Sequence, residues 1–572
     1  MAPTKERLHS LMHLFIACLL KLSTAAPCLP DQASSLLQLK ASFIGDNLPS
    51  WQAGTDCCHH WEGVTCDMAL GRVISLDLGE FDLTSSRLDP ALFNLTSLKN
   101  LSLAFNYFSG ASLPACGFER FTDIMHLNLS CTNVLDHIPV GIACLKNLVT
   151  IDLSGNGLYF ERPSFKTFMA NMSNLRELYL DGVDLSSSGS TWSTVLADSI
   201  PQLRVLSLSG CSMSGSIHSS FSKLRSLTMI DLGYNFELTG KVPEYFSKLS
   251  SLTVLDISSN KFEGHFPTKI FQLKSLRTLD LSDNHMLSVR LTHFPTGNNL
   301  ETLNLIGTNF SYGMPSSFAK LEHIKKLGLN VMDIDNKLPA LISKLPSLDD
   351  LQLMGPDTKN PILSWVSNLT QLTHLRFGGY DFSELVSTWI GKLTRLESLT
   401  IVDCSFSIPI PYQIGNLTKL VELEFWSCDF PEQRMPSWIG NLTKLVSFSI
   451  SHCNFCGPIP STIGNLIQLE ELAVRSSHIS GKIPKSLFAL PALQWLLLVD
   501  NQLIGSLEDI PAPLSSPLWW IDLSSNQLTG PIPKSFFQLK NLRILHLGSN
   551  KLTGPVKANA TRPILDQINY TV

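Results

Sequence analysis

The pattern L-x-x-L-x-L recurs twenty times between Val73 and Leu547, with a mean period of about 25 residues. Apolar residues alternate within each copy, which places one set of side chains inward and the other outward on a short strand. One such strand cannot bury its own leucines, so neighbouring copies must stack to share a continuous core. The spacing therefore predicts a solenoid of about twenty stacked coils, not a set of separate globular domains.

The composition agrees with one large repeat array. Hydrophobic residues make up 44% of the 572 residues, and charged residues only 16%. This balance is expected when every coil spends several residues on the shared core. The formal net charge of −5 argues against a nucleic-acid partner.

Two further features follow the predicted strand in many copies. An asparagine such as Asn260, Asn284 or Asn526 stands eight residues after the first leucine, where its amide can bond the turning backbone of adjacent coils. A turn such as Leu238-TGKVP and a short helix-like segment such as Ser461-TIGNL then close the coil. These residues resemble the plant-specific class of leucine-rich repeats. The resemblance implies an α/β solenoid, a curved superhelix with a parallel β-sheet on its concave face.

The start of the chain has the layout of a secretory signal peptide. Lys5 and Arg7 precede the apolar run 11–20, and small residues follow with a cleavage site after Ala25. This run is shorter than the about 20 residues that cross a membrane, and we expect no later membrane span. The expected organisation is a signal peptide (1–25), an N-terminal cap (26–72), the repeats (73–556) and an irregular tail (557–572).

N-x-S/T triplets support passage through the secretory pathway. Three of them share the sequence NLT and the same phase of the repeat, which indicates repeated exposure on one flank. The predicted glycosylation sites are Asn94, Asn171, Asn309, Asn368, Asn416 and Asn441.

Four cysteines lie between the predicted signal peptide and the repeats. Cys28 opens the segment, and Cys57, Cys58 and Cys66 lie in the sequence CCHHWEGVTC. From the residues alone, three disulfide pairings are open, and a zinc site fits poorly because two adjacent cysteines hinder tetrahedral coordination. The segment resembles the plant leucine-rich-repeat N-terminal cap. That resemblance implies the disulfides Cys28–Cys57 and Cys58–Cys66.

Eight further cysteines lie within the repeats, four of them at the asparagine position and four elsewhere. Those at the asparagine position are Cys211, Cys404, Cys428 and Cys453, and their regular phase predicts a structural role. Those off this phase are Cys116, Cys131, Cys144 and Cys456, for which pairing and the free thiol both stay open.

The sequence contains no enzyme signature, neither a G-x-S-x-G elbow nor an H-E-x-x-H motif nor a set of kinase motifs. The adjacent acids Asp349-Asp350 and Glu470-Glu471 fit a solvated face better than a catalytic pair, which needs a defined separation across a cleft. We therefore expect no catalytic residue, no metal and no cofactor.

The tenth to seventeenth copies differ from the others. Their asparagine position holds Thr308, Met332, Pro356, Tyr380, Cys404, Cys428, Cys453 and Ser477. Distinctive side chains stand at their outward positions and in the next copy, namely His374, Arg376, Glu422, Glu424, Trp426, His452, Glu471, Arg475 and Trp495. Exposed Trp and Arg commonly anchor interfaces, so we predict a ligand-binding site here. The alternative is a solvated face that varies freely, with Trp426 partly packed on its neighbours.

The cap, the repeat class and the number of repeats resemble the ectodomain of plant receptor-like proteins. The resemblance implies a non-enzymatic recognition protein for defence or development, which binds a peptide, protein or pathogen-derived ligand on its concave face. It also implies a receptor kinase as co-receptor and an extracellular location, or the plasma membrane if the full gene product carries a membrane helix.

The C-terminus departs from this family. Residues 557–572 lose the period and hold no cysteine cap and no membrane helix, so we interpret the chain as a truncated receptor. The alternative is a soluble apoplastic leucine-rich-repeat inhibitor of a microbial wall-degrading enzyme, or a decoy, although such inhibitors have fewer repeats. A structural wall protein would predict uniform outward residues, which the varied later copies contradict.

Overall fold

The computed structural model describes residues 26–45, 47–310, 313–330, 338–355, 361–382, 389–511, 513–553 and 567–569. The predicted signal peptide lies outside these residues. So do Met332 and Pro356, which stand at the asparagine position of the repeat, called the ladder position from here on. The chain divides into two compact units, 1–288 and 289–572, and each is described by itself.

The N-terminal cap covers the first coil. Helix α2 (Pro30–Ala41) and the short helix α3 (Cys57–His60) precede strand β1 (Val64–Cys66), which pairs antiparallel with the first repeat strand β2 (Val73–Asp77). The Gln32 side chain accepts a hydrogen bond from the backbone N–H of Val73 at 2.6 Å. Cap and first coil are therefore joined by a sheet edge and a buried polar contact.

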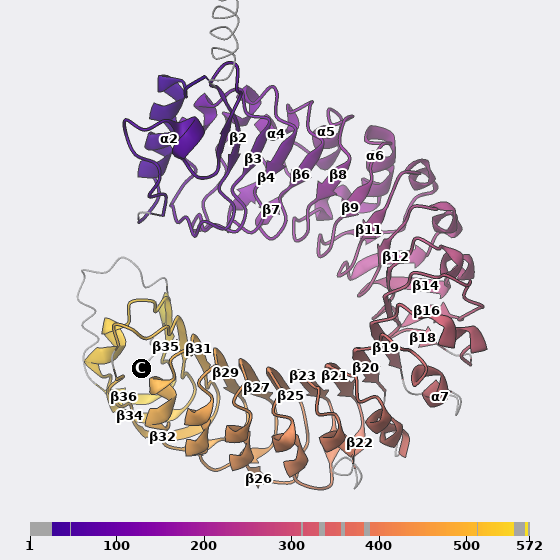
Figure 1. Cartoon of the computed structure of the whole chain (residues 1–572), viewed down its shortest axis with the longest axis vertical. Helices are drawn as coiled ribbons and strands as arrows, with labels where there is room; N and C mark the ends of the chain where they lie inside the picture. Colours follow the sequence, from indigo (N-terminus) through magenta and orange to yellow (C-terminus); the bar gives the residue numbers. More distant parts are fainter. Residues whose placement is uncertain are drawn as a thin grey trace, which may run out of the picture. The chain divides into compact units, whose positions relative to one another are not determined.

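Parallel strands follow β2 in chain order through the rest of the first unit (Figure 1). They are β3 (Asn100–Ser102), β4 (His126–Asn128), β6 (Thr150–Asp152), β8 (Glu177–Tyr179), β9 (Val205–Ser207), β11 (Met229–Asp231), β13 (Val254–Asp256) and β15 (Thr278–Asp280). The leucines of the pattern point away from solvent, and Leu252, Leu255 and Ile257 have no exposed surface. The alternation read from the sequence is therefore the alternation of core and surface.

Short strands and single-turn helices form the rest of each coil in the first unit. The strands are β5 (Leu135–His137) with β7 (Gly157–Tyr159), and β10 (Ser214–Gly215), β12 (Glu237–Lys241), β14 (Lys261–His265) and β16 (Met286–Val289). The helices are η1 (Pro90–Asn94), η2 (Phe118–Arg120), α4 (Val140–Ala143), α5 (Phe165–Met169), η3 (Ser186–Thr191), α6 (Trp192–Ser199), η4 (Ser219–Lys223), η5 (Glu244–Lys248) and η6 (Thr268–Gln272).

The second unit repeats this plan. Its parallel strands are β17 (Thr302–Asn304), β19 (Lys326–Asn330), β20 (Asp350–Met354), β21 (His374–Gly378), β23 (Ser398–Val402), β25 (Glu422–Trp426), β27 (Ser447–Ser451), β29 (Glu471–Arg475), β31 (Trp495–Leu497), β33 (Trp520–Asp522) and β35 (Ile544–His546). Strand β37 (Gln567–Asn569) pairs parallel with β35. The tail predicted to be irregular thus contains one more strand in the register of the repeats.

Minor strands and helices complete these coils. The strands are β18 (Asn309–Phe310), β22 (Asp381–Phe382), β24 (Ser405–Phe406), β26 (Gln433–Arg434), β28 (Phe455–Cys456), β30 (Ser480–Gly481), β32 (Gln502–Ser506), β34 (Gln527–Pro531) and β36 (Lys551–Thr553). The helices are η7 (Ser316–Lys320), α7 (Leu338–Ile342), η9 (Pro361–Asn368), η10 (Ile390–Lys392), η11 (Tyr412–Asn416), η12 (Ser437–Asn441), η13 (Ser461–Asn465), η14 (Lys485–Ala489) and η15 (Lys534–Gln538). Within the part of the chain that the structure describes, every helix is too short or too polar to cross a membrane.

Candidate functional site

The buried asparagines bond the backbone of two coils. The amide of Asn526 donates to the carbonyls of Leu498, Leu523 and Ser524 at 2.8, 3.1 and 3.1 Å, and its Oδ1 accepts from the N–H of Leu503 at 3.0 Å. Because these backbone groups are buried, leaving them unpaired would be costly. This is the role predicted for the amide from its place in the repeat.

The cysteines at the same position bond the backbone more weakly. The thiol of Cys428 lies 3.4 Å from the carbonyl oxygen of Ile401, and the thiol of Cys404 lies 4.0 Å from that of Phe377. A thiol is a poor hydrogen-bond donor. Burial raises the pKa of Cys404 to about 12, so it stays a neutral space-filling group, in agreement with the predicted structural role.

From β19 onward, the residue at the asparagine position of the repeat correlates with the length of the strands. Repeat strands from β19 to β29 have five residues, whereas β31, β33 and β35 in the asparagine coils have three; in the earlier coils, β9 with Cys211 and β17 with Thr308 also have three. Strand β29 shows both cases. It pairs over five positions with β27, where the Ser477 hydroxyl donates to Arg475 of its own coil, but over three with β31, where the Asn501 amide donates to the carbonyl of Val474 at 2.8 Å. We attribute the difference to competition for that carbonyl, which either the asparagine amide or the backbone N–H of the next strand can occupy.

Longer strands add a third outward position to the face. The first row, in register, runs His374, Ser398, Glu422, Ser447, Glu471 and Trp495, and the second runs Arg376, Thr400, Glu424, Ser449 and Ala473. The third row holds Val402, Trp426, Ser451 and Arg475. Eight of the nine predicted site residues therefore lie on one sheet within one unit.

His452 is the exception among the predicted residues. It follows strand β27 at a left-handed turn with a φ of 54°, and its backbone N–H donates to the carbonyl of Arg475 at 3.0 Å. Its side chain is exposed at the border of the face. The sequence assigned His452 to this coil, but the pattern did not show that it lies in the turn after the strand.

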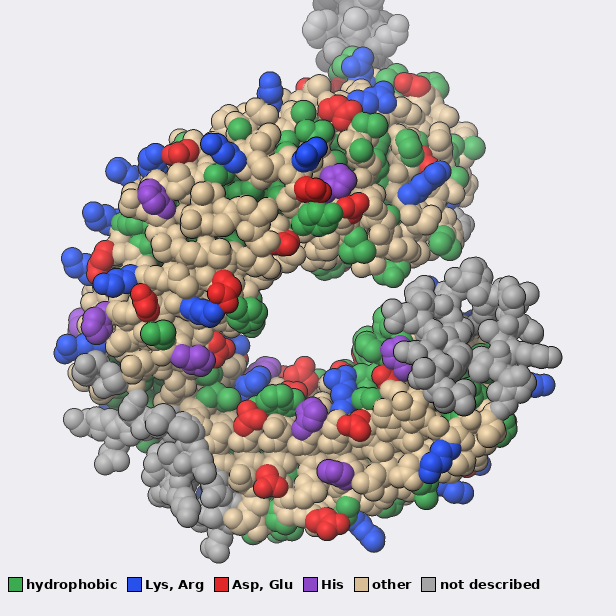
Figure 2. Space-filling view, turned by 180° about the vertical axis from the view of Figure 1, so that it is seen from behind, with side chains coloured by type: hydrophobic (Ala, Val, Ile, Leu, Met, Phe, Trp, Pro, Cys, Tyr) green, Lys and Arg blue, Asp and Glu red, His purple; other side chains and the backbone are tan. Residues whose placement is uncertain are grey.

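Four charged side chains of the face lack partners of their own. Among the described residues, Arg376, Glu422, Glu424 and Arg475 make no ion pair and no side-chain hydrogen bond. Trp426 keeps 43% of its surface exposed between two buried register partners, Val402 and Ser451. Figure 2 shows charged and histidine side chains close together along one rim of the later repeats. Exposed, unpaired groups of this kind are available to a ligand.

Sequence reasoning missed an aromatic continuation of the first row. Trp520 pairs in register with Trp495, and its ring lies edge-on to His546 with centroids 6.4 Å apart. The signal was present, because Trp520 occupies the same place in its copy of the pattern as Trp495 does.

The cap cysteines form the two disulfides that the family resemblance implied. Cys28 pairs with Cys57 and Cys58 with Cys66, with Cα–Cα distances of 5.5 and 5.4 Å. The thiolates that a zinc ion would need are thus consumed, although the Cys28, Asp56, Cys57 and Cys58 ligand atoms lie within 4.8 Å of one another.

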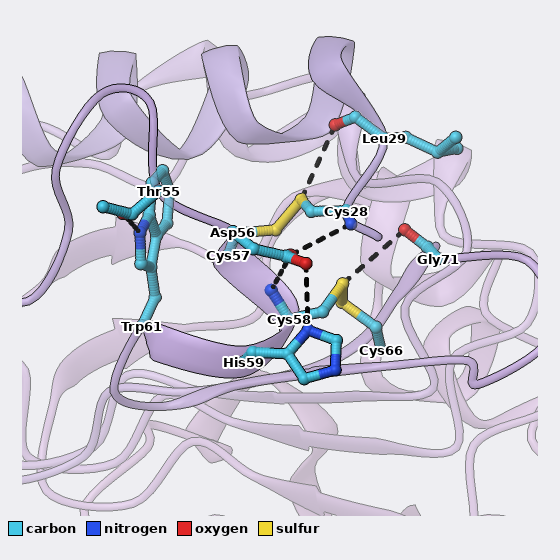
Figure 3. Close-up of polar contacts among 10 residues, drawn as sticks. All are labelled: Cys28, Leu29, Thr55, Asp56, Cys57, Cys58, His59, Trp61, Cys66 and Gly71. Carbon is cyan, nitrogen blue, oxygen red and sulfur yellow. Dashed lines mark hydrogen bonds and ion pairs between the residues drawn. A yellow bond between two sulfur atoms is a disulfide. The ribbon is translucent and has the colours of Figure 1, made fainter. Parts of the chain in front are cut away.

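Asp56 organises the cap around these disulfides (Figure 3). Its Oδ1 accepts from the backbone N–H groups of Cys28 and Cys58 at 3.0 and 2.9 Å, and its Oδ2 lies 2.9 Å from Nδ1 of His59. Burial raises the pKa of Asp56, but these hydrogen bonds outweigh it and leave the pKa below its usual value. The carboxylate is therefore a structural acceptor.

The cysteines off the ladder phase are free thiols. Cys116, Cys131 and Cys144 are exposed, and Cys456 is half-buried. The two alternatives left open by the sequence are thus resolved in favour of unpaired side chains for these four residues.

All six predicted glycosylation asparagines have exposed side chains. The three in the NLT triplets, Asn368, Asn416 and Asn441, are each the last residue of a short helix, η9, η11 or η12. The shared phase of the triplets thus corresponds to one structural position. Attachment of glycans there stays a prediction.

Family models match parts of the chain. The leucine rich repeat N-terminal domain matches residues 29–67, and leucine-rich-repeat models match residues 201–262, 444–466 and 517–539. The chain therefore has this cap and these repeats, and the matched models describe no enzyme.

The curated relatives are plant receptor-like proteins. Receptor-like protein 6 of Arabidopsis thaliana is 34% identical over 248 residues, which cover 38% of this chain and 24% of the relative. Receptor-like protein Cf-9 of Solanum pimpinellifolium is 33% identical over 251 residues, 39% of this chain and 28% of the relative. The matched part thus spans about a quarter of these proteins' length.

A solved structure supports the fold. The ectodomain of the Arabidopsis receptor kinase HAESA, in complex with an IDA peptide hormone that is extended at its N-terminus, is similar with a TM-score of 0.50 and 27% identity. The similarity covers 92% of this chain and 94% of that one. The leucine-rich-repeat solenoid expected from the sequence is confirmed.

Proposed function

We propose that this chain is the extracellular recognition part of a plant receptor-like protein and binds a peptide or protein ligand on the five-residue strands from β21 to β29. The observation that carries the proposal is the set of exposed charges on these strands that lack partners among the described residues. Charges that stabilise nothing within the fold are free to select a ligand.

The similarity to a receptor ectodomain crystallised with a peptide hormone agrees with this proposal. The matched models describe a cap and repeats, and we propose that a separate protein carries the signal. A receptor kinase that joins the ligand-bound chain is the partner we propose, in defence or development, at the surface of the plant cell.

The test recovers peptides from plant extracellular fluid on the immobilised chain and identifies them by mass spectrometry. The double variant Trp426→Ala with Arg376→Ala should lose peptides that the wild type enriches. The control Thr278→Ala, at a half-buried outward position of β15, should keep them. Equal recovery on all three proteins would contradict the proposal.

A further inference from the structure

Charged and hydroxyl-bearing strands alternate across the binding face. Strands β21, β25 and β29 carry ionisable outward side chains, whereas β23 between the first two carries Ser398 and Thr400, and β27 carries Ser447 and Ser449. In the first row the alternation extends to Glu471, and in the second row it ends at Ala473 on β29. Strand β25 is therefore flanked on both sides by strands with hydroxyl side chains, whereas β21 also borders β20, which places Asp350 in register with His374.

This alternation keeps opposite charges apart. Strands β19 and β20 show the opposite case, because Lys326 on β19 lies 3.3 Å from the carboxylate of Asp350 on the neighbouring strand β20. Arg376 and Glu424 are separated by the Thr400 strand, which at a spacing of about 4.8 Å per strand puts their backbones roughly 10 Å apart. The two side chains consequently stay unpaired, Arg376 exposed to solvent and Glu424 half-buried.

The charges have a fixed order along the sheet. The positive side chain of β21, Arg376, comes first, with the imidazole of His374 on the same strand, followed two strands later by the negative pair Glu422 and Glu424 on β25. The indole of Trp495 on β31 lies three strands beyond β25 in the first row. Strand β29 lies between β25 and β31 and carries both signs, Glu471 in the first row and Arg475 in the third. A ligand that crosses the strands would thus meet a positive site on β21, a negative site on β25 and, beyond β29, the apolar indole on β31.

We propose that the face selects an extended peptide segment with an acidic residue, a basic residue about three positions away and an apolar residue about four positions beyond that. The inference rests on the proposed function and names the chemistry of its ligand. An extended chain rises about 3.3 Å per residue, so three residues span two strand spacings and four residues span three.

The hydroxyl strands have a role in this arrangement. Ser398, Thr400 and Ser449 lie beneath the stretches of ligand between the charged sites. Hydroxyl groups can donate to or accept from the peptide main chain whatever its side chains are. The charged side chains would thus select the sequence of the peptide, while the hydroxyl groups would bind its main chain.

Two synthetic peptides on a Gly/Ser background test the order of the charges. The matched peptide has glutamate, then lysine three positions on, then leucine four positions after it. In the exchanged peptide the glutamate and the lysine trade places, and a reversed copy of each peptide covers both chain directions. Calorimetry on the full chain at low salt should show at least tenfold tighter binding of one matched peptide than of its exchanged partner, a preference that added salt weakens.

A charge-reversed protein provides the complementary measurement. The double variant Arg376→Glu with Glu424→Arg should prefer the exchanged peptide. The control Lys419→Glu with Glu432→Lys alters two exposed charges outside the strands without changing the net charge and should keep the wild-type preference. Circular dichroism establishes that each variant is folded.

Three results would overturn the inference: equal affinity of the wild type for both peptides, a preference that the reversal leaves unchanged, or no binding of either peptide at about 1 mM. The proposed function can survive each of them. If natural peptides are still lost on Trp426→Ala with Arg376→Ala, the face binds a ligand and only the charge order is wrong.

Discussion

Strands β11, β13 and β15 present a different outward face from strands β21 to β29. The first group has three-residue strands and aspartates in register, Asp231, Asp256 and Asp280. Each of these carboxylates accepts a hydrogen bond from a backbone N–H two residues further on, at 2.8–3.0 Å. The second group has five-residue strands whose charges alternate with hydroxyls and make few internal contacts.

The comparison separates charges that hold the backbone from charges that are free to bind. Like charges in adjacent strands repel, yet the aspartates are retained because each one closes the turn after its own strand. The charges of β21 and β25 close no turn. A charged residue at an outward position is thus informative only once its local hydrogen bonds are known.

The largest expected effect follows from removing a ladder amide. Asn526→Ala leaves a buried N–H and several carbonyls with fewer partners, which should cost about 3 kcal/mol locally. Hydrogen exchange of the Leu503 amide, which donates to Asn526, measures the loss. Cys404→Ala is the matched control at the same repeat position and should cost about 1 kcal/mol or less, since a thiol is a weak donor and its contact with the preceding coil, to Phe377, is 4.0 Å long. A similar loss of stability in the two variants would contradict the distinction between asparagine and cysteine at the ladder position.

The number of residues paired between neighbouring strands should change with the residue at the ladder position. Cys428→Asn places an amide near the carbonyl of Ile401, which now lies within the paired part of β23. The amide should displace the backbone N–H of Trp426 and raise its exchange rate about tenfold, equivalent to about 1.4 kcal/mol. Asn501→Cys should conversely extend the pairing of β29 with β31. Unchanged exchange in both variants would contradict the competition for the carbonyl.

The aspartate row should make stability depend on pH. Burial, with repulsion from Asp256 and other neighbouring carboxylates, raises the pKa of Asp231 to about 7, against about 3.9 in an unfolded chain. The native state therefore holds this proton more tightly, and stability falls as pH rises from about 4 to 7.

Asp231→Asn keeps the acceptor for Gly233 but removes the titration. The drop in melting temperature between pH 5 and pH 7 should shrink by about 2 °C or more relative to the wild type. Thermal unfolding at the two pH values measures it, and Thr278→Ala on β15, which changes no ionisable group, is the control. A drop that is the same in Asp231→Asn and in the wild type would show that this carboxyl is ionised in the folded protein at pH 5.

The smallest expected effect is on stability at the binding face. Arg376→Ala should leave the free energy of unfolding within about 0.5 kcal/mol of the wild type, because exposed residues outside a network contribute little. Urea unfolding measures this change. A loss well above that value would indicate that Arg376 supports the fold and would weaken its assignment to a ligand.

The sequence predicts the solenoid because leucine spacing reports directly on which side chains are buried. Leu375 and Leu423 are buried and their neighbours on either side point outward, as the alternation requires. The cap disulfides followed from resemblance, since three pairings were open from the residues alone. Strand β37 was missed because Tyr570 stands where the pattern expects leucine.

Strand length could not be read from the pattern. The copies around Leu423 and Ile521 both match the apolar alternation x-L-x-L-x, with isoleucine in place of the first leucine in the later copy, yet β25 has five residues and β33 three. In the later copies, an asparagine amide that donates to a carbonyl of the preceding coil accompanies the shorter pairing, and the leucine pattern does not encode that contact. The replacement of asparagine from Thr308 to Ser477 distinguished these copies from the others, but it did not predict the length of their strands.

The alternation of strands has a consequence for how such a face can change through inheritance. His374 and Glu422, the first members of two charged strands, are 48 residues apart, which is two coils. Loss of the single coil that carries β23 would place Arg376 beside Glu424, and the two would neutralise each other as Lys326 and Asp350 do. Gain or loss of a charged coil together with its hydroxyl-bearing neighbour would keep the alternation of exposed charges. The heritable unit of specificity in this molecule is therefore the pair of coils, although the unit of folding is the single one.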